Sequence, residues 1–474
     1  MPLFIKAAPV FAFALVTAPA LAGETKGAPK AAQTTVATAT TPADQAEPMP
    51  EAEPTVRLSV EVKTHFRDSK FAESLVDFPF PASFLAPGQT QVFERTTARG
   101  PSFEISTVNL MGEANLTPHI HAGFQVNFLD LYDRNPTSSD DRVSLRQAWI
   151  RFGNRTGMLE APTSHPFYAQ FGKAPRFTKQ LTRSMESYGL WGTAVGRFEE
   201  IGVEVGGDIG EHIYWRGTLV NGNPLFFRDP NLLAGDNGTP ERIPGNTNRP
   251  ISGTSPIYES GFPILYDAKA QDLNLSQGMQ KGVGVGVRGG NADAKHAFDV
   301  VGWRFSRNLQ ERPAIRGSFY LGDKTLLRGV VFPLAFNNDD PKVEYGANLQ
   351  ARLNAFRVFG QFVHQDIADL VRKGAEVEAS VTIPLNDIFL SGDTPVLTWI
   401  RPVFRFSNIK NNFTVAPMFP APSIGWDWKK YDLGLRVGII QNVDMTAEYS
   451  YHDVATSRGK LHPNEFVLTL RAGF

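Results

Sequence analysis

Residues 56–66, with the sequence VRLSVEVKTHF, place an apolar or neutral side chain at every second position and a polar one between. Successive side chains of a β-strand point to opposite faces, so this stretch predicts a strand with one apolar and one polar face. The same alternation returns around Phe124, Leu349, Val377 and Leu435. The runs match the roughly 9 to 11 residues with which a tilted strand crosses a bilayer, and they exceed the typical soluble strand of about 5 or 6. The pattern therefore favours a barrel that spans a membrane.

Short and long connections alternate between these predicted strands. Short ones fall at Thr117-Pro118 and Asn354-Ala355, and long ones at 67–100 and 222–280. Barrels of outer membranes have short periplasmic turns and long outer loops, which is the same rhythm. The sequence thus predicts an all-β, antiparallel, up-and-down transmembrane barrel of about sixteen strands over residues 55–474, with both ends of the barrel in the periplasm. The expected first residues of the strands are 55, 103, 119, 142, 166, 198, 212, 281, 296, 342, 356, 373, 396, 430, 444 and 464.

The number of strands stays open at one place. Residues 317–336 contain the runs 319–323 and 326–332, which could form one more hairpin. Eighteen strands is therefore the alternative.

Residues 1–54 are expected to lie outside the barrel. Lys6, an apolar core and Ala20-Leu21-Ala22 follow the order of a cleaved secretory signal peptide, assigned to residues 1–22. Residues 23–54 are mostly Ala, Thr, Pro and acidic residues, and they bury too little apolar surface to offset the entropy of ordering. We predict a disordered periplasmic leader there. Export without a later apolar stretch long enough for a helical span favours the outer membrane as the location.

Composition excludes several classes of function. The chain has 47 Lys and Arg, 48 Asp and Glu and no Cys. A net charge of -1 gives no reason to expect nucleic acid as a partner, and the lack of cysteine removes thiolate metal sites and thiol nucleophiles. His119 and His121 could share a strand face, yet two ligands without a third favour ordinary polar residues over a metal site. No spacing of Ser, His and Asp is typical of a hydrolase, so we expect no enzyme, metal or cofactor.

The stretch 284–289, GVGVRG, satisfies the dinucleotide-binding pattern G-x-G-x-x-G. That pattern needs a following helix to receive the pyrophosphate, but here the glycines lie within an alternating strand. We expect the valines at 283, 285 and 287 to face lipid. The glycines between them would then face inward and leave room for a loop packed against the wall.

The chain ends in FVLTLRAGF, residues 466–474. Phe466, Leu468 and Leu470 occupy every second position, and Phe474 is the last residue. Such a final strand resembles the signal that the outer-membrane assembly machinery reads in Gram-negative porins. These four residues are the expected assembly signal.

Two neighbouring stretches carry a more specific resemblance. Residues 146–152, RQAWIRF, and residues 168–175, YAQFGKAP, are similar to a pair of strands in the phosphate-selective porin family. In that family the second strand precedes the loop that folds into the channel. The resemblance implies an internal loop after residue 175, a passive channel and a homotrimer. It covers only these stretches, and the rest of the chain matches in architecture alone.

The loop 173–197 is rich in cations and contains one acid, Glu186. If it folds inward, its cations would line a constriction and bind anions, because Arg matches carboxylate and phosphate with a bidentate fork. A solvated basic outer loop is the equal alternative, although Tyr188, Leu190 and Trp191 favour burial against a wall. The expected constriction residues are Lys173, Arg176, Lys179, Arg183 and Arg197.

Alternation also assigns faces to the charged residues of the strands. With apolar residues on the lipid side, more cations than carboxylates face the lumen, which favours anions in the pore. Trp426, Trp428 and Tyr431 are expected in aromatic girdles at the membrane interfaces. The cations assigned to the lumen include Arg142, Arg146, Arg151, Arg304, Arg352, Arg357, Arg401 and Arg405.

Residues and resemblance together predict a passive outer-membrane porin for small hydrophilic solutes, favouring phosphate or other small anions. The expected partners are those solutes, outer-membrane lipid and lipopolysaccharide, the assembly machinery and two further copies of the chain. A scaffold barrel or a barrel enzyme without an open pore is the alternative, and a soluble exported β-sandwich is a third.

Overall fold

A computed structural model describes the barrel and parts of its loops. The chain divides into two units, Met1–Pro50 and Glu51–Phe474, and the barrel belongs to the second. The predicted signal peptide and the leader up to residue 53 lie outside the described residues. The described residues are 54–69, 75–78, 92–95, 102–128, 143–154, 167–178, 180, 183–195, 199–222, 257–259, 269–271, 279–290, 295–308, 314–316, 341–367, 370–385, 390–391, 394–412, 426–456 and 459–474.

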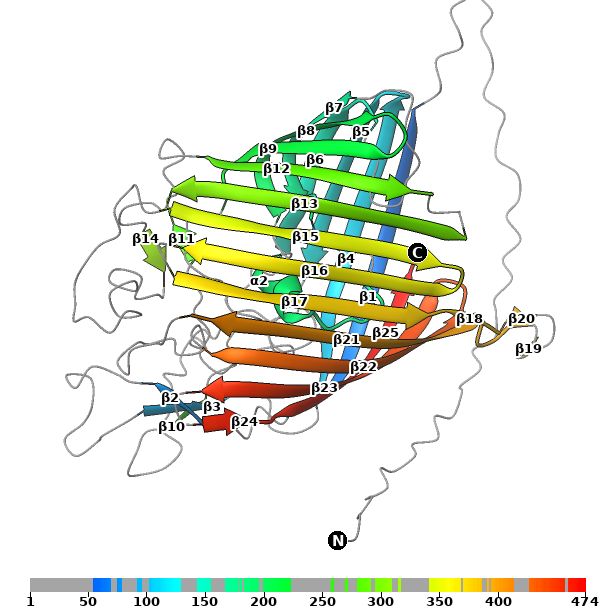
Figure 1. Ribbon diagram of the computed structural model, residues 1–474. Coiled ribbons are helices and arrows are strands. Elements are labelled where there is room, and N and C mark those ends of the chain that lie inside the picture. The colour runs from blue at the N-terminus through cyan, green and yellow to red at the C-terminus, as the bar shows by residue number, and fades with distance from the viewer. Residues whose placement is uncertain are drawn as a thin grey trace, which may run out of the picture. The chain divides into compact units, whose positions relative to one another are not determined.

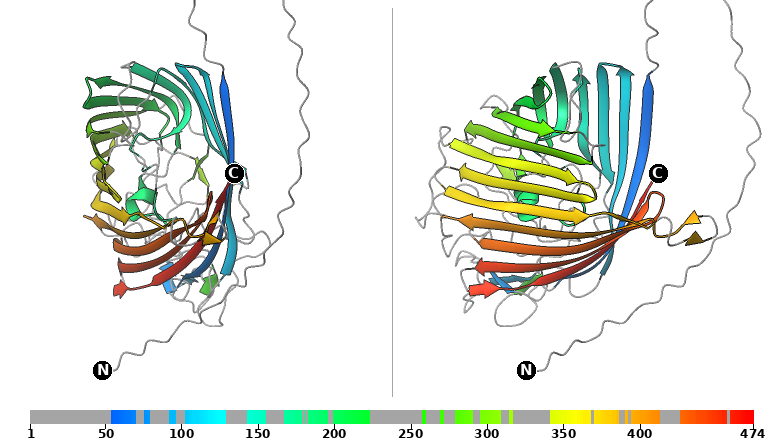
Figure 2. Two further views of the ribbon diagram at one scale, coloured as in Figure 1. Left: turned by 90° about the vertical axis from the view of Figure 1, so that its right-hand side faces the viewer. Right: turned by 45° about the vertical axis from the view of Figure 1, so that its right-hand side comes forward.

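Sixteen long strands form a closed antiparallel barrel (Figures 1 and 2). Each long strand pairs with the next one along the chain, and the last, β25, pairs with the first, β1. Two short strands, β18 (Ile383–Pro384) and β24 (Gly459–Leu461), extend the same sheet. The sixteen are β1 (Thr55–Ser69), β4 (Ser102–Thr117), β5 (Ile120–Phe128), β6 (Val143–Phe152), β7 (Phe167–Pro175), β8 (Glu199–Ile209), β9 (Ile213–Val220), β12 (Gln280–Gly289), β13 (His296–Asn308), β15 (Pro341–Leu353), β16 (Phe356–Ile367), β17 (Leu370–Val381), β21 (Trp399–Asn411), β22 (Asp427–Ile440), β23 (Val443–Thr456) and β25 (Asn464–Gly473).

The number and positions of the strands confirm the prediction of sixteen. The largest offsets are about three residues, at the starts of β17, β21 and β22, within the usual uncertainty of element boundaries. β13 pairs with β15 from His296 to Asn308, along its whole length. No further hairpin is therefore inserted in the wall between them. Residues 317–336, where a further hairpin was suggested, lie outside the described residues, and the two additional strands of the sheet are the short β18 and β24.

The outer face of the barrel is apolar. In β12, Val283, Val285 and Val287 are 60, 61 and 46% exposed, whereas the residues between them are buried. Leu433 and Leu435 of β22 are 59 and 45% exposed in the same alternating way. A closed barrel satisfies every ladder hydrogen bond within lipid, and its apolar face meets the acyl chains. The fold is that of a transmembrane barrel.

Most short connections lie at one end of the barrel, which we call the short-turn end (Figure 1). Asn354, in the turn between β15 and β16, has φ 55°, and Gly210, between β8 and β9, has φ 66°. Gly and Asn adopt this left-handed backbone at little cost, so both fit tight turns. The chain also ends here, where the N–H of Phe474 donates to the carbonyl of Val60 at 2.8 Å.

The remaining elements are short. β2 (Leu75–Phe78), β3 (Val92–Arg95) and β10 (Ile257–Glu259) form a three-stranded sheet, β11 (Lys269–Gln271) pairs with β14 (Ala314–Arg316), and β19 (Leu390–Ser391) pairs with β20 (Thr394–Pro395). Helix α2 (Leu190–Ala194) lies inside the barrel (Figure 2). Among the helices of the described residues, none has the length and apolar character to cross a membrane.

Candidate functional site: an internal segment and the passage beside it

Residues 176–195 run through the inside of the barrel, and we call them the internal segment. The segment joins β7 to β8, and residues 179, 181 and 182 within it lie outside the described part. Hydrogen bonds connect it to β1, β15, β17, β21 and β23. The prediction that this loop folds into the barrel is confirmed, and the alternative of a solvated outer loop is wrong.

Three carboxylates of the wall accept hydrogen bonds from the backbone of the internal segment. Glu448 accepts from the N–H groups of Glu186 and Ser187, the second at 3.0 Å, Glu376 from Trp191 and Gly192 at 3.0 and 3.2 Å, and Glu378 from Ser184 at 3.0 Å. Hydrogen bonds to an ionised acceptor are stronger than those between neutral groups. Buried carboxylates on two strands thus hold the segment by its main chain, whatever side chains it carries.

Glycines of the wall receive side chains of the internal segment. The pairs are Gly284 with Phe177, Gly374 with Trp191 and Gly434 with Met185. A Cβ atom at these glycines would lie only 2.6, 2.7 and 2.9 Å from the paired side chain. Such contacts are too short to form, so only glycine leaves the space. The prediction that inward glycines of β12 make room for a loop is confirmed at Gly284 only, because Gly282 and Gly286 lie against the wall side chains Phe305 and Tyr214.

The internal segment completes an apolar core inside the barrel. Leu190 and Trp191 have no exposed surface, which confirms their predicted burial. The indole N–H of Trp191 donates to the carbonyl of Asn408 at 2.7 Å, so its polar atom is also satisfied. The wall side of this core includes Val301, Trp303, Phe305, Val363, Ile409 and Trp428.

Buried ion pairs hold the internal segment at two places, Arg176 and Ser187. The guanidinium of Arg176 lies 2.7 Å from Glu200 and 2.8 Å from Glu344. Burial opposes the charge of Arg176, but the two carboxylates outweigh burial and raise the pKa of the guanidinium above its usual range. Arg405, 1% exposed, donates to Asp432 at 2.8 Å and to the carbonyl of Ser187 at 2.8 Å. Both arginines therefore hold the segment and are saturated with acceptors.

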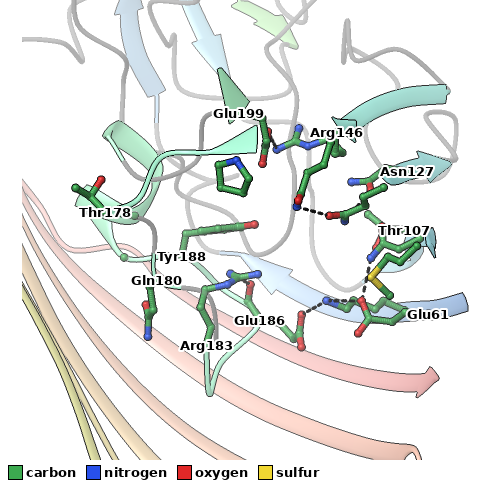
Figure 3. Close-up of a pocket in the computed structure, with 18 of the residues that line it drawn as sticks. Glu61, Thr107, Asn127, Arg146, Thr178, Gln180, Arg183, Glu186, Tyr188 and Glu199 are labelled. Carbon is green, nitrogen blue, oxygen red and sulfur yellow. Dashed lines mark hydrogen bonds and ion pairs between the residues drawn. The ribbon is translucent and has the colours of Figure 1, made fainter. Parts of the chain in front are cut away.

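A polar cavity of about 260 Å³ lies on the other side of the internal segment, and we call it the passage (Figure 3). Its opposite wall comes mainly from β1, β4, β5 and β6. In Figure 3, Arg183, Glu186 and Tyr188 face it from the segment, with Glu61 and Asn127 across from them. The passage thus lies between the internal segment and the wall opposite the one to which the segment is bound.

Side-chain amides form a row along the wall of the passage. Gln147 donates to Gln125 at 2.9 Å, and Gln125 donates to Asn127 at 3.1 Å. Asn109 donates to Glu61 at 2.9 Å and continues the row onto β1. Amides can both donate and accept hydrogen bonds, so the row can replace part of the hydration shell of a polar solute.

Charges in the passage are close to balanced. Of the residues that line it, Glu61, Glu186, Glu199 and Glu376 are acids, and Lys63, Arg146 and Arg183 are cations. Lys63 lies 3.0 Å from Glu186 and Arg146 lies 2.9 Å from Glu199. The guanidinium of Arg183 lies 3.6 Å from the ring centre of Tyr188 and donates to the carbonyl of Glu186 at 2.8 Å.

Glu186 stays ionised in this setting. Burial acts to raise its pKa, but the charges of Lys63, Arg183 and Arg436 outweigh burial and lower the pKa to about 2. The cations of the passage are therefore matched by fixed negative charge.

The structure brings together some of the predicted site residues and separates others. Arg146, the extra residue of a β-bulge in β6, and Arg183 line the passage. Lys173 is directly opposite Ile201, which is 53% exposed, so it shares the outer face and lies away from the passage. Its ammonium group donates to the carbonyl of Leu145 at 2.5 Å. Arg142, Lys179 and Arg197 lie outside the described residues.

Three assignments of faces were wrong, for one physical reason. Trp303 and Phe305 are buried at 5 and 1%, so Arg304 between them lies on the outer face and not in the lumen. Trp426 and Trp428 are 5 and 1% exposed in the internal core and are not girdle residues. Apolar residues face inward wherever the wall packs against the internal segment. The assumption that the apolar residues of a strand face the lipid is therefore not valid there.

The carboxylates that hold the segment were missed as site residues. The backbone partners of Glu376, Glu378 and Glu448 are distant in sequence, so no local pattern reveals these contacts. A weak signal existed, since two acids at alternate positions of an apolar strand, 376 and 378, must find partners when buried.

Comparisons with known proteins give a likeness to outer-membrane proteins at low identity. No protein-family model and no curated protein matches the sequence. The outer membrane channel DcaP of Acinetobacter baumannii covers 89% of this chain and 98% of its own length, with a TM-score of 0.48 at 10% identity. The anion-selective porin from Comamonas acidovorans covers 89% and 100%, with a TM-score of 0.45 at 9% identity. OmpT, an outer membrane protein of Vibrio cholerae, covers 90% and 100%, with a TM-score of 0.44 at 11% identity.

The barrel assignment rests on strand pairing and not on these likenesses. The resemblance of residues 146–152 and 168–175 to the phosphate-selective porin family stays a prediction.

Proposed function

We propose that this protein is a passive diffusion channel of a Gram-negative outer membrane, with the internal segment as its constriction. The observation that carries the proposal is the polar passage between the internal segment and β1, β4, β5 and β6. Side chains fill a barrel of about eight strands, whereas sixteen leave an aqueous lumen. Solutes cross down their own gradient, so neither an energy source nor a reacting group is needed.

Small hydrophilic solutes are the class that suits this passage. The amide row offers donors and acceptors in place of water, and Tyr188 beside Arg183 offers a flat surface. Paired charges produce no strong barrier against either sign of ion. Size and hydrogen bonding would then decide which solutes pass.

The anion preference belongs, in this proposal, to the lumen outside the passage. The passage itself holds more carboxylates than cations, and Arg176 and Arg405 are bound to wall acids. Arg146 and Arg183 remain the candidates for contact with an anion inside it. Arginines at the short-turn end, Arg352 and Arg357 among them, would raise the local concentration of anions at that mouth.

Assembly completes the proposal. Residues 1–22 would be removed on export, and the chain would form a homotrimer among outer-membrane lipid and lipopolysaccharide. Phe466, Leu470 and Phe474 are 38, 46 and 76% exposed, so they can be read by the assembly machinery. Leu468 shares their face and is partly buried.

Single-channel recording tests the proposal. Purified protein in a planar bilayer should give discrete current steps, in threes if it is a trimer, and a salt gradient should give a reversal potential of anion-favouring sign. Correctly inserted protein that carries no current would refute the channel. A current with a cation-favouring reversal potential would refute only the anion preference.

A further inference from the structure

A single row of side chains crosses five neighbouring strands, and we call it the outer row. Each member is directly opposite the next one in the register of the sheet. The outer row consists of Arg304 of β13, Tyr345 of β15, His364 of β16, Lys373 of β17 and Lys410 of β21. Since neighbouring strands are about 4.8 Å apart, four such spacings give the row a length of about 19 Å. Three cations are thus aligned along one line of the wall.

The outer row faces away from the lumen. Tyr345 itself is 41% exposed. On β17, Val377 is 42% exposed and shares the face of Lys373, because the two positions differ by an even number. On β21, Phe404 is 44% exposed and shares the face of Lys410 for the same reason. The row therefore lies on the face that meets the membrane.

The outer row lies in the half of the barrel away from the short-turn end (Figure 1). Lys410 is the last residue but one of β21, and Lys373 is the fourth residue of β17. The rings of Tyr345 and His364 stack with their centres 4.5 Å apart. Tyrosine is enriched where a bilayer meets water, and the long side chain of lysine places its charge at the same level. The row is therefore at the level of lipid headgroups in the leaflet that the long loops face.

The cations of the outer row are not compensated by acids of the wall. Arg304, Lys373 and Lys410 are exposed, and within the part of the chain that the structure describes none of them forms an ion pair. Lys373 is directly opposite Lys410, and like charges in that position destabilise a sheet. Asp366 is opposite Val371, in the next pair on the same face, and forms no ion pair with Lys373. The row thus attracts negative charge from the membrane side.

We propose that Arg304, Lys373 and Lys410 bind the phosphates of one lipopolysaccharide headgroup in the outer leaflet. Arg304 and Lys373 are three strand spacings apart, about 14 Å, which suits two separate phosphates on a large headgroup and not one small ion. Guanidinium and ammonium groups both bind phosphate, the first through paired hydrogen bonds. The stacked rings of Tyr345 and His364 lie between the cations and offer a flat surface to a sugar ring.

Binding at this site is direct, without a metal bridge. Divalent cations bind proteins mainly through carboxylates, and none of the five members of the outer row is an acid. The inference rests on the proposed outer-membrane location, gives the expected lipopolysaccharide partner a position on the wall, and does not depend on conduction through the lumen.

Native mass spectrometry of the folded protein in a neutral detergent tests the site. The probes are lipid A, which is the phosphorylated anchor of lipopolysaccharide, the same lipid with its phosphates removed, and inorganic phosphate, each in the presence of EDTA. We expect lipid A to bind the wild type in EDTA and the dephosphorylated lipid to bind much less. Lys373→Gln should bind lipid A about fivefold less tightly, as for one cation at an anionic lipid surface, and a double variant with Lys410→Gln about 25-fold less tightly.

Lys173→Gln is the matched control, because it removes one lysine charge from the outer face on β7, away from the row. It should bind lipid A like the wild type, and all variants should migrate like the folded wild type when unheated samples are compared by electrophoresis. Equal binding in the wild type and the double variant, or an equal loss in Lys173→Gln, would overturn the site.

Three other results would overturn the proposal as well. Binding that EDTA abolishes would show that a divalent cation holds the lipid. Displacement of lipid A by inorganic phosphate at the same concentration would assign the row to a free ion. A change in the number of subunits in the same spectra, with lipid binding unchanged, would assign the row to an interface between copies of the chain. Currents in planar bilayers test the channel separately, so failure of one proposal leaves the other standing.

Discussion

Replacing Glu448 is expected to loosen the internal segment without opening the barrel. The carboxylate of Glu448 accepts the N–H groups of Glu186 and Ser187, and it is 2% exposed. Each hydrogen bond to a charged group contributes about 1.5–3 kcal/mol. Glu448→Ala removes both acceptors, which costs the docked segment about 3–6 kcal/mol. Glu448→Gln keeps one acceptor oxygen and should cost about half as much.

The expected result is a graded change in single-channel current. A segment that is loosely bound to the wall can move into and out of the passage, which changes the width of the passage. The conductance should therefore fluctuate more in Glu448→Ala than in Glu448→Gln. The closed ladder of sixteen strands is untouched, so both variants should migrate like the folded wild type when unheated samples are compared by electrophoresis. That migration is the control for folding.

One result would refute this reasoning. If both variants fold and their conductance and noise equal those of the wild type, the backbone contacts of Glu448 do not position the segment. The packing of the segment's side chains against the wall glycines, together with Arg176, would then be sufficient to hold the segment.

Three further predictions concern the same segment. Gly284→Leu should change the conductance, because a Cβ atom at this position would lie 2.6 Å from Phe177. Gly302 faces open space, so Gly302→Leu is the control and should leave the conductance unchanged. Equal currents in the two variants would show that Gly284 is not needed to make room for Phe177. Arg176→Gln leaves two buried carboxylates without their cation and should destabilise the docked segment by about 3–5 kcal/mol. The measurement is proteolysis of residues 176–195 in the intact barrel. Resistance to proteolysis equal to that of the wild type would argue against an anchoring role for Arg176. The pKa of Glu186 is lowered from 4.5 to about 2, so the stabilisation by its charge is complete above pH 4.5 and is lost as the pH falls through 2. The single-channel current should therefore stay constant down to about pH 4. A transition centred near pH 4.5 would contradict the ion pair between Glu186 and Lys63.

The strands could be predicted because lipid imposes alternation on them from outside. Most residues that face the bilayer are apolar, so runs such as the valines of β12 are visible in one sequence. The inner face obeys no such rule, since part of it contacts water and part contacts the internal segment. Arg304 was misplaced for this reason, because the aromatic residues beside it face inward.

The anchoring of the segment could not be predicted from local sequence. Glu448 and Glu186 are 262 residues apart, and Glu376 and Trp191 are 185 apart. No turn or strand pattern relates positions at such distances. The basic residues of the loop were visible and suggested anion binding, but a charge count does not reveal that Arg176 is already matched by acids on β8 and β15.

The two walls of the barrel decide where the passage lies. One wall presents glycines at 284, 374 and 434 together with buried acids, which accept both the apolar side chains and the backbone of the internal segment. The other wall presents amides such as Gln125 and Gln147, which hydrogen-bond to each other and can bind water, so this wall is polar. A segment with both apolar side chains and unpaired N–H groups is therefore more stable on the first wall. The width of the passage thus depends on glycines and acids of β12, β17, β22 and β23 more than on the cations of the segment itself, so variants that retune solute size should be sought in those strands.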